Sequence, residues 1–182
     1  MIRKRLRLWF QNLAEKLVSK MLTSSQNEIV SRKIFSGQII AGAMICGALF
    51  FGGMIASTAH WSDLGGPFKL MATIAAASAI ILFGVAFEAP TLFPQLPNFR
   101  KSDDPAIQDK GVGEIGSMLV SQNTARLALL LAGVFANIMP LMFEPRWVNV
   151  AAIGIGLLLM LINFPFRSRS LRKIESRLSD WA

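Results

Sequence analysis

Four long apolar stretches, separated by polar segments, dominate the pattern of the chain. They cover residues 34–59, 68–87, 120–143 and 147–166. A helix needs about 20 apolar residues to cross a hydrocarbon core about 30 Å thick. Because no water reaches that core, every backbone amide must be bonded within its own segment, which favours helices. The pattern therefore predicts an all-α, polytopic membrane protein with four transmembrane helices.

The polar segments between the spans predict the connections. Residues 60–67, HWSDLGGP, and residues 144–146, EPR, are short turns, so the four spans should form two antiparallel hairpins. Residues 89–114 contain four prolines and several charges, which predicts a loop in water between the hairpins. The spans and this loop together form one transmembrane domain over residues 34–166.

Residues 1–33 precede the first span and are strongly basic. Apolar residues recur at three- and four-residue spacing through roughly the first 24 positions, with basic residues largely on the other side. Such a basic amphipathic helix lies in the headgroup region with its apolar face down. The residues expected to bind the membrane surface are Arg3, Lys4, Arg7, Trp9 and Phe10. The alternative is a cytoplasmic helix that packs on a partner protein.

The distribution of charge predicts the orientation. The chain has 19 Lys and Arg against 11 Asp and Glu, and its formal net charge is +8. Eight basic residues precede the first span, and five follow the last span in the tail, residues 167–182. Basic flanks remain in the cytoplasm, near anionic lipid headgroups, so both termini and residues 89–114 are expected there. We expect an inner-membrane protein whose partners include the bilayer and anionic headgroups, and no nucleic acid, because no binding motif accompanies the charge.

Small residues recur along one side of several spans. They are spaced as in small-xxx-small motifs, which let helix backbones approach closely. The expected helix-packing residues are Gly37, Ala41, Ala48, Gly52, Ala56, Ala72, Ala76, Gly84, Gly154 and Gly156. Such faces fit the helices of other membrane proteins, in a hetero-complex or a homo-oligomer.

Polar side chains are scarce within the spans, and two pairs carry specific expectations. Glu88 ends the second span and Arg126 begins the apolar part of the third, which predicts an ion pair between the hairpins. The alternative is that each reaches water independently. Asn137 lies near mid-membrane with Ser78 at a similar depth, which predicts an interhelical hydrogen bond. The alternative for Asn137 is a ligand or ion site.

Residue types that carry chemistry are also scarce. The chain is 53% hydrophobic and 16% charged, and its spans contain no Ser/Lys or Ser/His pair, paired carboxylates, HExxH or CxxC motif. The sole histidine, His60, is predicted at the outer interface, where copper binding with nearby methionines is a minor alternative to a solvated side chain. We therefore expect no catalytic residue, no cofactor and no metal.

The last third of the chain contains RLALLLAGVFANIMPLMFEP and, at the end of the fourth span, NFPFRSRSLRKIESRL. With these segments it resembles a group of small four-helix bacterial membrane proteins of unknown function. In that group the third helix begins with an Arg and an Ala-Leu run, and the fourth ends in Phe-Pro before a basic amphipathic tail. Members often have an acidic residue early in the third helix, where this chain has Leu129 to Ala132. The resemblance implies topology and no activity.

These patterns favour a membrane protein that works by binding. We expect a non-enzymatic accessory or assembly subunit, or a scaffold, whose small-residue faces meet other helices. One alternative is a small oligomeric transporter or channel whose path is lined by polar residues such as Asn137 and Gln38. A second alternative is an enzyme acting on a lipid or a quinone at the inner interface through Glu88, Arg126 and Asp104.

Overall fold

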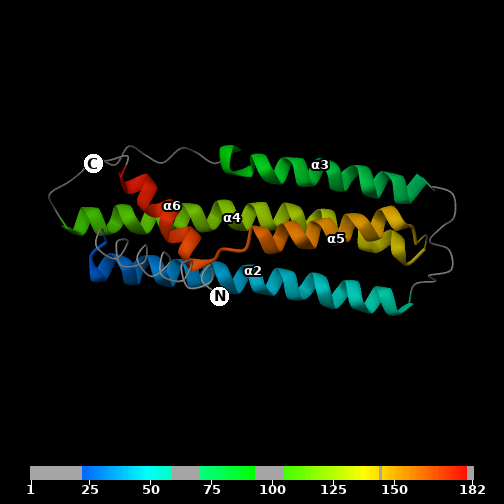
Figure 1. The fold of residues 1–182 in the computed structure, drawn as a ribbon, viewed down its shortest axis with the longest axis horizontal. Helices are drawn as coiled ribbons and strands as arrows, with labels where there is room; N and C mark the ends of the chain where they lie inside the picture. The colour runs from blue at the N-terminus through cyan, green and yellow to red at the C-terminus, as the bar shows by residue number, and fades with distance from the viewer. Residues whose placement is uncertain (1–21, 59–69, 93–104, 144, 180–182) are drawn as a thin grey trace, which may run out of the picture. The chain divides into compact units, whose positions relative to one another are not determined.

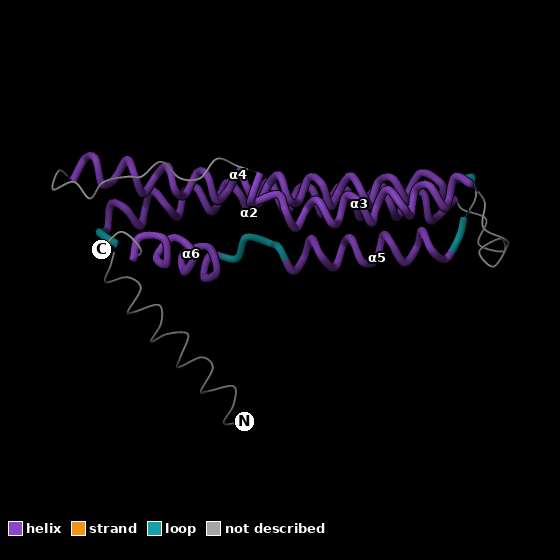
Figure 2. Tube along the Cα trace, turned by 90° about the horizontal axis from the view of Figure 1, so that it is seen from above, coloured by secondary structure: helices purple, strands orange, loops and turns teal. Residues whose placement is uncertain are grey.

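The structure, a computed structural model, describes residues 22–58, 70–92, 105–143 and 145–179, and every regular element in them is an α-helix (Figures 1 and 2). The helices are α2 Ser24–Thr58, α3 Leu70–Leu92, α4 Pro105–Leu141, α5 Trp147–Ile162 and α6 Arg167–Ser179. The predicted all-α class is confirmed for these residues. The expected membrane-surface helix, with Arg3, Lys4, Arg7, Trp9 and Phe10, lies outside the described residues.

Several of these helices could cross a membrane. Three are long and apolar enough: Ser24–Thr58, Leu70–Ala89 and Ala106–Leu141. α5 has 16 residues, which at 1.5 Å each span only about 24 Å. It becomes a fourth candidate when it is taken together with α6 as one bent span. The described helices thus indicate a multi-pass membrane protein.

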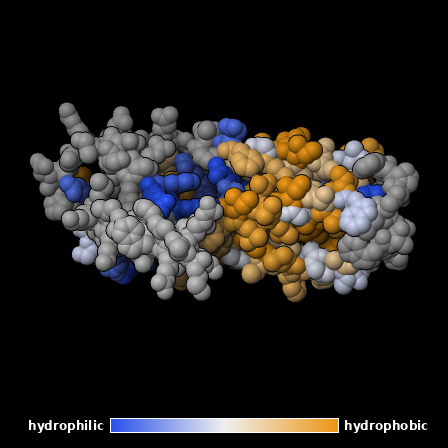
Figure 3. Space-filling view, in the orientation of Figure 1, coloured by the Kyte–Doolittle hydropathy of each residue, from blue (hydrophilic) through white to orange (hydrophobic). Residues whose placement is uncertain are grey.

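The chain divides into two compact units. Unit 1 contains Met1–Gly37, Leu96–Val120 and Pro165–Ala182, and unit 2 contains Gln38–Gln95 and Ser121–Phe164. α2 and α4 contribute residues to both units, whereas α3 and α5 belong to unit 2 and α6 to unit 1. On the face shown in Figure 3, apolar residues gather over unit 2.

Unit 2 exposes large apolar side chains that water would not tolerate. Phe50 of α2 is 70% exposed, Ile80 of α3 is 73% exposed and Leu158 of α5 is 57% exposed. Soluble proteins rarely expose contiguous apolar patches larger than a few hundred Å². Unit 2 is therefore suited to hydrocarbon.

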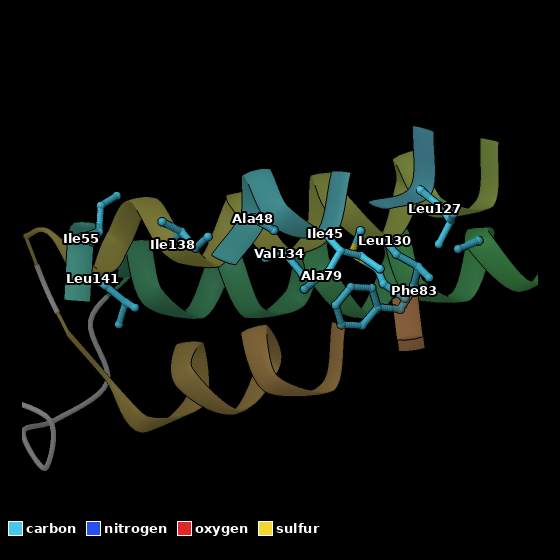
Figure 4. Packing of buried hydrophobic residues seen from close by; sticks show 13 residues of the cluster. Ile45, Ala48, Ile55, Ala79, Phe83, Leu127, Leu130, Val134, Ile138 and Leu141 are labelled. Atoms are coloured by element: carbon cyan, nitrogen blue, oxygen red, sulfur yellow. The ribbon is translucent and has the colours of Figure 1, made fainter. Parts of the chain in front are cut away.

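All four helices of unit 2 contribute to its apolar core (Figure 4). Its buried members are Ala41, Ile45, Ala48 and Ile55 of α2, Ala79, Phe83 and Ala86 of α3, Leu127, Leu130, Val134, Ile138 and Leu141 of α4, and Met160 of α5. The Phe83 ring lies in a notch between two glycines. A β-carbon added at Gly133 would lie 2.5 Å from a ring carbon, and one added at Gly156 would lie 2.8 Å from another. Glycine at both positions therefore lets α3, α4 and α5 approach closely around this ring.

Unit 1 has a smaller apolar core and polar ties between its helices. The buried core residues are Leu22, Val30, Ile34, Val112, Ile115 and Ile174. Ser25 Oγ of α2 donates to Asp109 Oδ2 of α4 at 3.1 Å, and Arg167 Nη2 of α6 donates to Ser31 Oγ of α2 at 3.2 Å. These contacts hold α4 and α6 against the N-terminal half of α2.

The start of α4 corrects the prediction of a loop over residues 89–114. α3 continues to Leu92 and α4 begins at Pro105, so residues 105–114 are helical. Pro105 is one of the four prolines that favour a loop in the sequence. A proline is tolerated in the first turn, because the N–H it lacks would have no helix partner there.

The ends of α2 and α5 are set by local caps. Thr23 N–H donates to Gln26 Oε1 at 3.2 Å, and Gln26 N–H donates to Thr23 Oγ1 at 3.3 Å. This reciprocal capping box starts α2 at Ser24, ten positions before the predicted span. α5 ends at Ile162 rather than at the predicted residue 166, with Asn163 as its C-cap. Pro165 follows, and the residue before a proline is biased away from the helical conformation.

Candidate functional site

Two groups of polar atoms interrupt the apolar core of unit 2, and each joins α3, α4 and α5. The amide cluster consists of the Asn137 and Asn149 side chains with the main-chain oxygens of Ala72, Ala75 and Gly133. The arginine cluster consists of the Arg126 and Asn163 side chains with the main-chain oxygens of Ala86 and Phe87.

The amide cluster joins the last turns of α4 to the first turns of α3 and α5. Asn137 and Asn149 are both 0% exposed. Asn149 Nδ2 donates to Asn137 Oδ1 at 2.8 Å and to the Ala72 oxygen at 3.3 Å. Asn137 Nδ2 donates to the oxygens of Ala75 at 3.1 Å and Gly133 at 2.9 Å. Each amide nitrogen serves two acceptors, which fixes the orientation of both amide groups.

One atom of the amide cluster has no partner among the described residues. Asn149 Oδ1 is buried and accepts no hydrogen bond from the described part of the chain. Turning the amide over would not help, because its nitrogen already serves two acceptors. An unsatisfied buried polar atom costs about 1–3 kcal/mol. Asn149 Oδ1 thus keeps a capacity to accept a hydrogen bond that the described residues do not use.

The expected bond between Ser78 and Asn137 takes a different form. Ser78 Oγ donates to the oxygen of Ala75 at 2.8 Å, and the same oxygen accepts from Asn137. Ser78 and Asn137 therefore share an acceptor, and the side-chain partner of Asn137 is Asn149. Asn149 is not among the polar residues expected to pair, although an amide in an otherwise apolar span was a usable signal.

The arginine cluster forms at a break in the hydrogen-bond ladder of α3. Pro90 lies within α3 and has no N–H, so the oxygen of Ala86, four residues earlier, lacks its usual helix donor. Arg126 Nε donates to this oxygen at 3.0 Å, and Nη2 donates to the oxygen of Phe87 at 3.3 Å. Nη1 donates to Asn163 Oδ1 at 3.0 Å. One guanidinium thus binds α3 and α5 from α4.

The charge of Arg126 lies near the C-terminal ends of two helices. Ala86 and Phe87 belong to the last two turns of α3, and Asn163 is the C-cap of α5. Asn163 Nδ2 also donates to the oxygen of Leu159 in the last turn of α5 at 2.8 Å. A helix C-terminus carries roughly half a negative elementary charge. Two such ends can balance one guanidinium without a carboxylate.

The predicted ion pair between Glu88 and Arg126 stays a prediction. Glu88 is exposed and follows Phe87, whose main-chain oxygen binds Arg126. The hydrogen bonds of Arg126 to the described residues end on carbonyl oxygens, so it reaches α3 through the main chain. Asn163, which sequence reasoning did not select, is its side-chain partner.

The predicted helix-packing residues differ in what surrounds them. Three alanines are buried, namely Ala41, Ala48 and Ala72, and Ala56 and Ala76 are half-buried. Three glycines approach another helix of their own unit, where an added β-carbon would meet Val120 at Gly37, Ile138 at Gly52 and both Val134 and Phe83 at Gly156. At Gly84 and Gly154 an added β-carbon would meet nothing within 4 Å. Packing of these two on another helix therefore stays a prediction for intermolecular contacts.

Within the described ranges, no group of three or more His, Cys, Asp or Glu side chains is placed to hold a metal ion. In comparisons with models of protein families, with curated proteins and with solved structures, nothing matches this chain. Function is therefore inferred from the geometry of each unit.

Proposed function

We propose that this chain is a non-enzymatic integral membrane protein that acts by helix–helix binding, as an accessory or assembly subunit or a scaffold of a membrane complex. In this proposal α2, α3, α4 and α5 cross the inner membrane as two hairpins, with both termini in the cytoplasm. The basic residues before α2 and after α5 support that orientation.

The use of the polar atoms in unit 2 supports a binding role most directly. The Nδ2 atoms of Asn137 and Asn149 both donate to main-chain oxygens of α3, and Asn149 Nδ2 also donates to Asn137. Arg126 binds the C-terminal ends of α3 and α5. These groups hold three helices together, and a substrate would have to displace them. Unit 2 therefore exposes an apolar surface whose helices are held in place by these hydrogen bonds.

Gly84 of α3 and Gly154 of α5 mark positions where another helix can approach that surface. Both are exposed, and no other part of the described chain comes within 4 Å of where their β-carbons would be. Val85 and Ile155, their sequence neighbours, are 39% and 54% exposed. Small residues beside larger apolar ones allow the close backbone approach by which membrane helices gain dispersion contacts.

Association in mild detergent tests the proposal. Full-length protein with a small C-terminal tag is purified from native membrane, and stoichiometric partners or self-oligomers are identified by mass spectrometry. We expect Gly84→Leu and Gly154→Leu to weaken this association and leave thermal unfolding unchanged, because both positions are open. Gly52 is unsuitable for this purpose, because an added β-carbon there meets Ile138 of the same chain at 3.7 Å.

Open glycines on α2 provide matched controls. Gly42 and Gly53 also have nothing within 4 Å of an added β-carbon. If only Gly42→Leu and Gly53→Leu lost association, the contact surface would be assigned to α2. A protein that has no partner, remains monomeric in every preparation and is unaffected by all four substitutions would refute a helix-binding role.

The amide cluster favours a small oligomeric transporter or channel as the second candidate. Asn149 Oδ1 is buried without a described partner, so this acceptor remains available for a hydrogen bond to a transported species. In reconstituted vesicles, a gradient-dependent flux that Asn149→Leu abolishes would support this candidate. Flux equal to that of empty vesicles would remove it.

A further inference from the structure

α6 has two chemically different sides, and the structure shows what covers one of them. Ile174 is 1% exposed in the core of unit 1, and Leu171 packs against the same core. Arg167 binds Ser31 of α2 through its guanidinium. α6 is therefore held on unit 1 by its apolar side.

The other side of α6 is basic and exposed. Arg169, Arg172 and Lys173 are all exposed, and their spacing of three and four residues places them on one face of the helix. Phe166, 49% exposed, precedes α6, and the Arg169 guanidinium carbon lies 6.0 Å from the centroid of its ring. We call these four residues the basic face of α6.

The sequence of α6 gives this helix a net positive charge. α6 contains five basic residues and one acidic residue, Glu175. α6 as a whole therefore carries an excess of positive charge, and a complementary partner should be anionic.

We propose that the basic face of α6 binds the anionic phospholipid headgroups of the bilayer that holds unit 2. This proposal rests on the proposed membrane insertion of α5. Arg and Lys bind phosphate oxygens through charge-assisted hydrogen bonds. α6 begins at Arg167, shortly after α5 ends at Ile162, and five residues reach at most about 18 Å. The basic face thus remains within reach of the headgroups at that end of α5.

The covered apolar side determines the kind of binding. A free amphipathic helix inserts its apolar face and also binds neutral bilayers. Leu171 and Ile174 are already packed in unit 1, so α6 cannot insert them without leaving that core. Its lipid binding must then depend on charge, with Phe166 as the apolar anchor, and it should weaken as salt screens exposed charges.

The test measures lipid selectivity of the full-length protein. Purified protein in mild detergent is equilibrated with phosphatidylglycerol or phosphatidylcholine, and retained lipid is counted by native mass spectrometry. At about 0.1 M salt we expect Arg169→Gln/Arg172→Gln/Lys173→Gln to lower the preference for phosphatidylglycerol roughly a hundredfold, at about fivefold for each basic side chain. The charge-retaining variant Arg169→Lys/Arg172→Lys/Lys173→Arg should retain most of the preference.

A second triple variant separates the basic face from net charge. Arg32→Gln/Lys33→Gln/Lys110→Gln removes three positive charges from exposed positions of α2 and α4. Equal losses in the two triple variants would overturn the proposal, and so would an unchanged preference in the α6 variant. Loss of a co-purifying acidic protein in place of lipid would assign the face to a protein partner and also overturn it. Alkaline extraction of the same membranes tests insertion separately: an inserted protein with unaltered selectivity refutes the lipid site alone.

Discussion

The amide cluster and the arginine cluster join the same three helices at opposite ends of α3 and α5. The amide cluster lies at their N-terminal turns, is neutral, and contains side chains that are 0% exposed. The arginine cluster lies at their C-terminal turns, carries a full charge and is half-buried. Helix polarity accounts for the difference, because a cation is stabilised at helix C-termini and disfavoured at helix N-termini.

Access to solvent separates the two clusters in a second way. A charged side chain can be kept where it reaches water or headgroups, and Arg126 is only partly buried. A fully enclosed position favours neutral amides whose donors are all used, as in Asn137 and Asn149. The charge of each cluster thus fits the direction of the helices that surround it and its access to solvent.

The largest expected effect comes from the arginine cluster. Arg126→Leu removes three hydrogen bonds and leaves the C-terminal ends of α3 and α5 without a cation. We expect it to lower the free energy of unfolding by about 2–3 kcal/mol. SDS-driven unfolding followed by circular dichroism measures the loss. The free energy of unfolding of Arg126→Lys should lie between those of the wild type and Arg126→Leu. A lysine keeps the positive charge, but it lacks the planar guanidinium that binds three oxygens.

Pro90 sharpens this prediction. In Pro90→Ala, a main-chain N–H becomes available to the oxygen of Ala86, which Arg126 otherwise serves. We expect Arg126→Leu to cost about 1 kcal/mol less in the Pro90→Ala background than in the wild type. Equal costs in both backgrounds would show that Arg126 does not compensate the break in α3.

The comparison also explains what the sequence could and could not predict. Long apolar runs are local properties, so the helical class and the presence of helices apolar enough to cross a membrane followed from them. Which polar residues meet depends on the rotation of each helix about its axis, and the apolar runs of α3 and α5 do not encode it. Asn149 and Asn163 were missed for that reason. Gly133 was missed because its role depends on where the Phe83 ring lies.

Asn149→Leu should have the next largest effect. It removes the donors to Asn137 and Ala72 and leaves Asn137 Oδ1 buried without a partner. We expect a loss of about 1–2 kcal/mol in the same SDS-unfolding measurement. Asn137→Leu/Asn149→Leu should cost less than the two single losses added together, by about 0.6–1.7 kcal/mol. Additive losses would mean that the two amides do not depend on each other.

Ser78→Ala should have the smallest effect, and it decides whether Ser78 belongs to the amide cluster. Its hydroxyl donates to the Ala75 oxygen within its own helix, so removing it breaks no bond between helices. Asn137 still donates to that oxygen. We expect a change below about 0.6 kcal/mol, the average for interhelical hydrogen bonds in membrane proteins. A loss as large as that of Asn149→Leu would place Ser78 in direct contact with Asn137, as the sequence first suggested.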